Sequence, residues 1–249
     1  MFHRIQLPPH YSPKTNSLPL SALGILLANL LLFSCDDGRI YEEVVAIPEE
    51  GRVVKLTGKL TGAENWSSGY NVVVAGFDET KEYAIITKAI PASECREVIL
   101  SGISDEVTRI ELCVVNRLRK RILSYETFDC PVTADTIRLD VGTKDVGMYA
   151  SLQSQLFNTT CANCHGASTH AAAGLYLTEG KSYDALVGKP SVKVNDKLLI
   201  NPGDADESVL YQTLATNISA AWNYDHTKEV LSDAWLDVLE DWIDDGAKK

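Results

Sequence analysis

Two cysteines and a histidine stand close together in the stretch NTTCANCHGAS, residues 158–168. Cys161 and Cys164 are three positions apart, and His165 follows directly. Two thiols at this spacing can form thioethers with the two vinyl groups of one porphyrin, and the next residue is then held beneath the iron as an axial ligand. The spacing therefore predicts one covalently bound haem c, with His165 as the proximal iron ligand.

Other chemistries also use a Cys-x-x-Cys pair. A thioredoxin-like redox pair sits in a βαβ pattern, and no such pattern surrounds residues 161–164. A structural zinc site needs four ligands, and the chain has no second Cys-x-x-Cys or His-x-x-x-His to complete one. A chance match of the short motif is the third alternative. A covalent haem is favoured because the motif stands in a chain with signals for export.

The export signal lies in the first 35 residues. Residues 18–35 read LPLSALGILLANLLLFSC, and the apolar run of about 15 residues is short for a bilayer span but typical of a signal peptide. The ending LLFSC resembles a lipobox, which implies cleavage before Cys35 and lipidation of that cysteine. We therefore expect a lipid-anchored protein of the cell envelope, on the periplasmic side or the outer surface. An ordinary signal peptide or a single anchor helix is the alternative.

Composition is that of a globular protein, with 249 residues, 45% hydrophobic and 23% charged. The formal net charge of −11 argues against a nucleic-acid partner, which normally requires a basic face. After the signal peptide, residues 36–50 are predicted to form an acidic tether. Residues 51–145 and 146–249 then differ in pattern, which indicates two further domains.

Residues 51–145 are rich in Val, Ile, Thr, Tyr and Phe, in short runs separated by turn-forming residues. Seven strands are predicted, at 52–62, 70–78, 83–90, 96–102, 107–115, 121–128 and 135–142. This number and spacing predict an all-β domain, an antiparallel β-sandwich of immunoglobulin-like size. The basic run Arg117, Arg119, Lys120 and Arg121 is interpreted as a solvated hairpin tip, with a docking patch for an acidic partner as the alternative.

Three cysteines fall in this predicted β-domain. In an oxidising compartment, two of them could pair. Cys113 and Cys130 flank a predicted hairpin and are the first choice for a disulfide, which would leave Cys95 over. The alternative is that all three are buried thiols.

Residues 146–249 have a helical period, which predicts an all-α domain. The pieces LFNTTCANCHG, INPGDADESVLYQTL and LSDAWLDVLEDWIDDGA resemble a class I, single-haem cytochrome c domain of the bacterial multi-domain type. The resemblance covers residues 148–247. It implies that the first and last helices of the domain cross beside the haem, which would bring the Tyr149–Phe157 face against Trp235–Trp242.

The family usually places a methionine on the other side of the iron, and this chain departs from that pattern. Met148 lies in the first predicted helix, on the wrong side of the haem, and Met1 belongs to the signal peptide. His226 stands about where the methionine is expected. The resemblance therefore implies bis-histidine ligation by His165 and His226. An open or water-filled sixth position, or ligation by His170, are the alternatives.

These features favour electron transfer with a redox partner protein rather than catalysis. A haem with two protein ligands has no free position for a substrate. A haem enzyme or gas sensor with an open distal site is the first alternative. A binding lipoprotein whose β-domain carries the main role is the second.

Overall fold

Seven strands account for the first half of the part that the structure describes. The computed structural model describes residues 51–249, apart from 92–94, 133–134, 167–170, 223 and 231. The predicted signal peptide, the tether and Cys35 lie outside the described residues. The strands are β1 (Arg52–Thr61), β2 (Tyr70–Phe77), β3 (Ile86–Ala89), β4 (Cys95–Ile103), β5 (Arg109–Asn116), β6 (Arg121–Asp129) and β7 (Thr136–Asp145). They fall at the segments predicted from the sequence.

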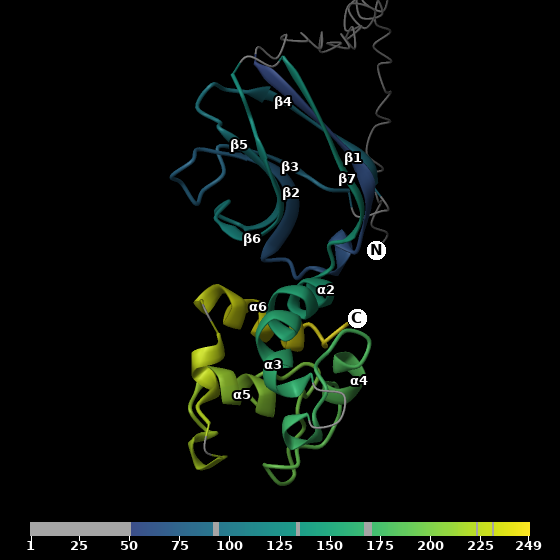
Figure 1. The fold of residues 1–249 in the computed structure, drawn as a ribbon, viewed down its shortest axis with the longest axis vertical. Helices are drawn as coiled ribbons and strands as arrows, with labels where there is room; N and C mark the ends of the chain where they lie inside the picture. Colours follow the sequence, from purple (N-terminus) through teal and green to yellow (C-terminus); the bar gives the residue numbers. More distant parts are fainter. Residues whose placement is uncertain (1–50, 92–94, 133–134, 167–170, 223, 231) are drawn as a thin grey trace, which may run out of the picture. The chain divides into compact units, whose positions relative to one another are not determined.

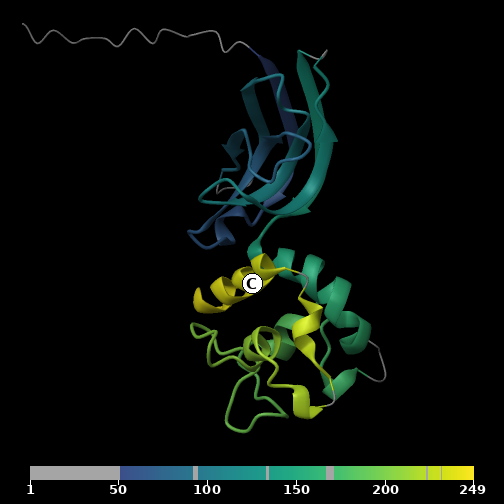
Figure 2. The ribbon, with the colours of Figure 1, turned by 90° about the vertical axis from the view of Figure 1, so that its left-hand side faces the viewer.

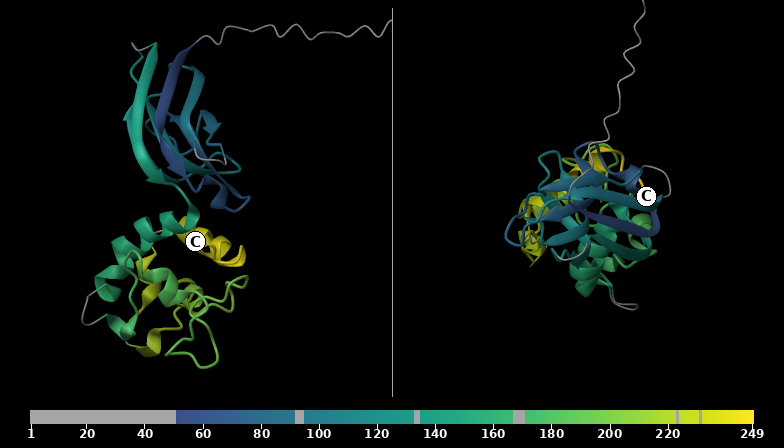
Figure 3. Two further views of the ribbon diagram at one scale, coloured as in Figure 1. Left: turned by 90° about the vertical axis from the view of Figure 1, so that its right-hand side faces the viewer. Right: turned by 90° about the horizontal axis from the view of Figure 1, so that it is seen from above.

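The strands form two sheets, with orders β4-β1-β7 and β3-β2-β5-β6. Strand β1 pairs with β4 in antiparallel fashion, but it pairs with β7 in parallel, from Val53 opposite Thr136 to Thr61 opposite Asp145. Figures 1 and 3 show β1 and β7 running side by side. The prediction of a wholly antiparallel sandwich is therefore wrong, because the first and last strands run in the same direction.

Both sheets turn one face toward a shared core. Along β5, Ile110, Leu112 and Val114 are buried in this core. Cys113 and Val115, which alternate with Leu112 and Val114, belong to a smaller cluster on the other face. This alternation follows from the two-residue period of a strand. Strand β5 is nevertheless buried on both faces, so its sequence reads as nearly continuous apolar residues.

The second half of the chain contradicts the predicted fold class, a β-sandwich followed by an all-α cytochrome c domain. Its helices are short: α2 (Met148–Leu152), α3 (Ala162–His165), α4 (Ser182–Leu186), α5 (Val209–Ala215) and α6 (Asp233–Asp244), with a π-helical segment η2 (Gln153–Cys161). Single 3-10 turns are η3 (Ala172–Gly174), η4 (Ala220–Trp222) and η5 (His226–Glu229), and η1 (Ala63–Asn65) follows β1. Isolated bridges, such as Pro190 with Leu198, hold part of the intervening chain. No large all-α domain is present in the described residues, and none of their helices is long and apolar enough to cross a membrane.

The first and last helices of this half are in contact, as Figure 2 shows for the green α2 and the yellow α6. The rings of Tyr149 and Trp242 are stacked, with centroids 5.5 Å apart. Helix α6 ends at Asp244, and two residues later, at Gly246 (φ 94°), the Gly246 N–H donates to the Ile243 carbonyl and the Ala247 N–H to the Trp242 carbonyl. This pair of bonds is a Schellman motif, which needs the left-handed conformation that glycine adopts freely.

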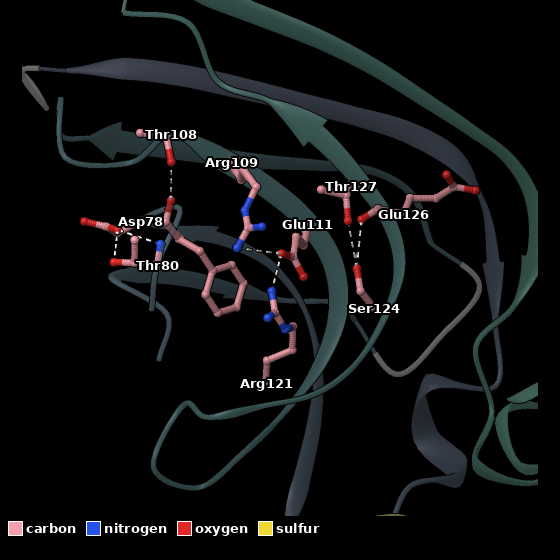
Figure 4. A network of polar contacts seen from close by, with 10 residues as sticks. Asp78, Thr80, Thr108, Arg109, Glu111, Arg121, Ser124, Glu126 and Thr127 are labelled. Carbon is pink, nitrogen blue, oxygen red and sulfur yellow. Dashed lines mark hydrogen bonds and ion pairs between the residues drawn. The ribbon is translucent and has the colours of Figure 1, made fainter. Parts of the chain in front are cut away.

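The outer face of the four-stranded sheet carries a charged network (Figure 4). The Glu111 side chain is 1% exposed, and its Oε1 lies 2.6 Å from Arg121 Nη1 and 3.8 Å from Arg109 Nη2. The Arg121 guanidinium also lies over the Phe77 ring, 5.3 Å from its centroid. Arg117 and Arg119 are exposed at the hairpin tip, as predicted. Arg121, by contrast, is only partly exposed and pairs with a buried carboxylate.

The predicted Cys113–Cys130 disulfide is wrong, because both residues are free, buried thiols. Cys113 belongs to the small cluster on the outer face of the four-stranded sheet. Cys130 belongs to the main core and accepts a hydrogen bond at Sγ from Arg52 Nη1, at 3.1 Å. The two thiols therefore lie in separate clusters. The side chain of Cys95 lies outside what the structure describes.

Candidate functional site

Cys161 ends η2, and the short helix α3 carries Cys164 and His165 directly after it. A side chain on Gly166, the residue that follows, would overlap the carbonyl oxygen of Ala162. Glycine therefore lets the chain leave α3 immediately after His165. Cys161 is partly buried against the core, whereas Cys164 is exposed. The two thiols and His165 thus lie within a single helical turn, as their spacing predicts.

His165 is fixed through both its backbone and its ring. The carbonyl of His165 accepts a hydrogen bond from Leu177 N–H at 2.8 Å. The ring Nδ1 lies 3.0 Å from the carbonyl oxygen of Ala172. A carbonyl can only accept, so Nδ1 must carry the proton. The neutral ring of His165 therefore has an unprotonated Nε2, which is the state that binds a metal.

His226 begins the 3-10 turn η5, which is capped by Asp225. The Oδ1 atom of Asp225 accepts hydrogen bonds from the N–H of Thr227 at 3.2 Å and from its hydroxyl at 2.6 Å. The ring Nδ1 of His226 lies 3.0 Å from Ser219 Oγ. The Tyr224 ring stands edge-on to the imidazole, with centroids 4.8 Å apart. A capped turn, a hydroxyl and an aromatic ring therefore surround His226.

The two imidazoles meet although their residues are far apart in the sequence. The ring centroids of His165 and His226 are 6.4 Å apart, and their planes are inclined by 31°. An imidazole nitrogen lies about 1.2 Å from its ring centroid and about 2 Å from a bound metal, so two imidazoles on opposite sides of one metal ion have centroids about 6.4 Å apart. The centroid separation in the structure equals that distance.

Burial shifts the protonation of the neighbouring groups. Burial, and then the nearby His165, lower the pKa of His226. Burial, and then the charge of Glu229, raise the pKa of the Cys161 thiol to about 12. A hydrogen bond to Glu229 raises the pKa of Tyr224. At neutral pH these shifts favour a neutral imidazole at His226 and a protonated thiol at Cys161.

The candidate donors of this site are two imidazoles and two thiols. In the described part of the chain, no group of three or more His, Cys, Asp or Glu side chains is placed to hold a metal. A haem iron receives four nitrogen ligands from its own macrocycle and needs the protein only at its two axial positions. Two imidazoles with centroids 6.4 Å apart, beside a pair of cysteines, could supply those two ligands. The residues present therefore fit a covalently attached haem.

The sequence also named residues that the structure does not bring to this site. Met148 is 1% exposed in the main core. His170 and Cys35 lie outside the described residues. Conversely, sequence reasoning missed Ala172 and Ser219, the partners of the two imidazoles. A backbone carbonyl has no signature in a sequence, and Ser219 is one serine among many.

Comparisons with known proteins find no match. No family model matches the chain, and neither a curated protein nor a solved structure matches it.

Proposed function

We propose that this chain is a c-type cytochrome of the cell envelope that carries one covalent haem and transfers electrons. Cys161 and Cys164 attach the haem, and His165 and His226 are its axial ligands. The observation that carries the proposal is the 6.4 Å separation of the two imidazole centroids beside the paired cysteines. The proposal does not require a large all-α domain, since four residues on short elements supply every protein ligand.

The chemistry of attachment balances without an oxidant. Each thiol adds across one vinyl group: a carbon–sulfur bond forms, and the thiol proton ends on the other vinyl carbon. The bound haem supplies a one-electron change of its iron. His165 and His226 would hold the iron from the protein side and leave no position for a small ligand, and the hydrogen bonds at their Nδ1 atoms keep the rings in place. Such a site suits an electron carrier rather than an enzyme.

Location and partner follow from the sequence. The lipobox-like ending at Cys35 supports a lipid anchor, and the acidic segment 36–50 supports a tether between the membrane and the β-strands. A lipid-anchored carrier exchanges electrons with a redox partner protein at the membrane or beyond it. The sheet-forming half would dock the carrier or space it from the membrane.

The first test is haem staining after denaturing electrophoresis. The full-length chain, produced with a c-type haem maturation system, should keep a stained band, because thioethers survive denaturation. The Cys161→Ala, Cys164→Ala double variant should lose the band. Cys113→Ala, which removes a buried thiol in another cluster, should keep it. A wild-type chain without stain, or a stained double variant, would refute covalent attachment.

The second test is optical spectroscopy of the purified holoprotein. Filled axial positions predict a low-spin spectrum without the absorption band of a methionine–iron bond, and no change when carbon monoxide is added to the reduced protein. A high-spin spectrum with rapid binding of carbon monoxide would contradict electron transfer and favour a haem enzyme or gas sensor.

A further inference from the structure

Ser219 lies directly behind His226. Its side chain is fully buried, between α5 and η4. Its Oγ lies 3.0 Å from His226 Nδ1, and the backbone N–H of His226 also donates to it at 3.5 Å. One hydroxyl therefore contacts both the ring and the backbone of the same residue. This arrangement fixes the ring relative to the turn that carries it.

The chemistry of the two partners differs. The carbonyl of Ala172 can only accept, so it dictates the tautomer of His165. A serine hydroxyl can donate or accept, so it permits either tautomer of His226. Only the tautomer with the proton on Nδ1 leaves Nε2 unprotonated and available to a metal. The direction of the Ser219–His226 hydrogen bond therefore decides whether His226 can act as a ligand.

We propose that Ser219 is the positioning residue of His226: its hydroxyl oxygen accepts the Nδ1 proton, which leaves Nε2 unprotonated and available to a metal. This inference rests on the proposed haem function. It adds that the tautomer and orientation of His226 exist before any haem is bound. The ring is thereby preorganised, although His226 stands on a single 3-10 turn rather than on a long helix.

Loss of the hydroxyl should weaken the ligand without removing it. Partners of metal-bound histidines typically change metal affinity by about 10- to 100-fold. In Ser219→Ala, His226 should therefore leave the iron more readily. Carbon monoxide can bind the reduced protein only after His226 leaves, so its binding rate should rise roughly 10- to 100-fold. Ser219→Thr keeps the hydroxyl and should restore the slow rate.

The matched control is Ser208→Ala. Ser208 is also fully buried, and its hydroxyl donates to the carbonyl of Asp204 at 2.8 Å and accepts from the N–H of Asn201 at 2.8 Å. Its replacement removes a buried hydroxyl of the same kind without touching His226. If Ser219→Ala binds carbon monoxide no faster than Ser208→Ala, the positioning role is overturned.

A haem-free measurement separates this inference from the proposed function. Nitrogen-15 NMR of the full chain without haem reports which ring nitrogen of His226 carries the proton. We expect the Nδ1–H form in the wild type and in Ser219→Thr, and a mixture of both forms in Ser219→Ala. A wild type with the proton on Nε2, or an Ser219→Ala variant with an unchanged tautomer, overturns the inference whatever the haem does. A chain that never stains for haem overturns the proposed function, whatever NMR reports.

Discussion

The ring centroids of His165 and His226 are 6.4 Å apart, although 60 residues of chain lie between the two residues. Three short segments create this proximity: α3, the 3-10 turn η5 and the connection that carries Ser219. Neither ring lies on a long helix. The hydrogen bonds at Nδ1 of each ring therefore orient the two rings in place of a rigid helical scaffold.

Replacing His226 with methionine should raise the reduction potential of the haem. Thioether ligation raises the potential relative to imidazole because imidazole is the stronger donor to ferric iron. Potentiometric titration of wild type and His226→Met measures the shift, and the variant should also gain the absorption band of a methionine–iron bond. An unchanged potential would mean that His226 is not a ligand.

His226→Ala is the companion of this experiment. Removal of the imidazole should open the sixth position and convert a low-spin haem to a high-spin form that binds carbon monoxide. The optical spectrum records both changes. A wild type that is already high-spin would mean that the sixth position of the iron is open. His226→Ala would then leave the optical spectrum unchanged.

The two cysteines of the motif should differ in reactivity in the folded, haem-free chain. Cys164 is exposed, whereas burial and then Glu229 raise the pKa of Cys161 to about 12. Alkylation requires the thiolate, so a raised pKa slows the reaction at neutral pH and lets its rate keep rising with pH through the alkaline range. Alkylation with iodoacetamide at pH 7 to 10, followed by peptide mass spectrometry, should show Cys164 modified first.

Equal rates at Cys161 and Cys164 would contradict this description of the site. Denaturant provides the control, since unfolding should remove the difference. The burial of Cys161 also affects haem attachment, because a thiol that is buried in the folded chain reacts more easily before folding. We therefore expect haem attachment to be more efficient on the unfolded chain.

The strands could be predicted from sequence because their signals are local. Apolar and polar residues alternate along Arg52–Thr61, and β-branched residues follow one another at Val72–Val74. Each pattern predicts a strand without reference to the rest of the chain. The parallel pairing of β1 with β7 could not be predicted in this way, because it joins strands about 80 residues apart. It reverses the direction expected of an antiparallel sandwich.

The predicted all-α domain failed for a related reason. Strong helical patterns at Met148–Leu152 and Asp233–Asp244 are real, but they were extended over a connection that contains only short helices, turns and isolated bridges. The roles of the candidate site residues stay predictions. A three-residue motif locates Cys161, Cys164 and His165, whereas Ser219 and Ala172 are recognised only from their positions in space.

The thiols of Cys113 and Cys130 should stay unpaired, because they lie in separate buried clusters. Burial raises the pKa of both thiols, which lowers their reactivity further. Mass spectrometry after alkylation should find neither modified in the folded chain and both modified in denaturant without a reductant. Modification that requires a reductant would indicate a disulfide and contradict the structure.

The ion pair of Glu111 with Arg121 should matter more for stability than the exposed arginines beside it. Glu111 is 1% exposed and Arg121 is 28% exposed, so removal of the arginine leaves a buried carboxylate with only the more distant Arg109. Breaking such a pair costs about 3–5 kcal/mol when both groups are fully buried. Because Arg121 is partly solvated, we expect Arg121→Ala to lower the free energy of unfolding by about 1–3 kcal/mol.

Two further variants make this prediction specific. Arg117 is exposed at the same hairpin tip and makes long hydrogen bonds of 3.3 and 3.4 Å to Ser68, so Arg117→Ala should change stability by no more than about 0.5 kcal/mol. Adding Glu111→Met to Arg121→Ala removes the orphaned carboxylate and should recover most of the loss. Urea denaturation measures all four proteins. The explanation through the buried carboxylate fails if Arg121→Ala lowers the free energy of unfolding no more than Arg117→Ala does. It also fails if the double variant is the least stable of the four proteins.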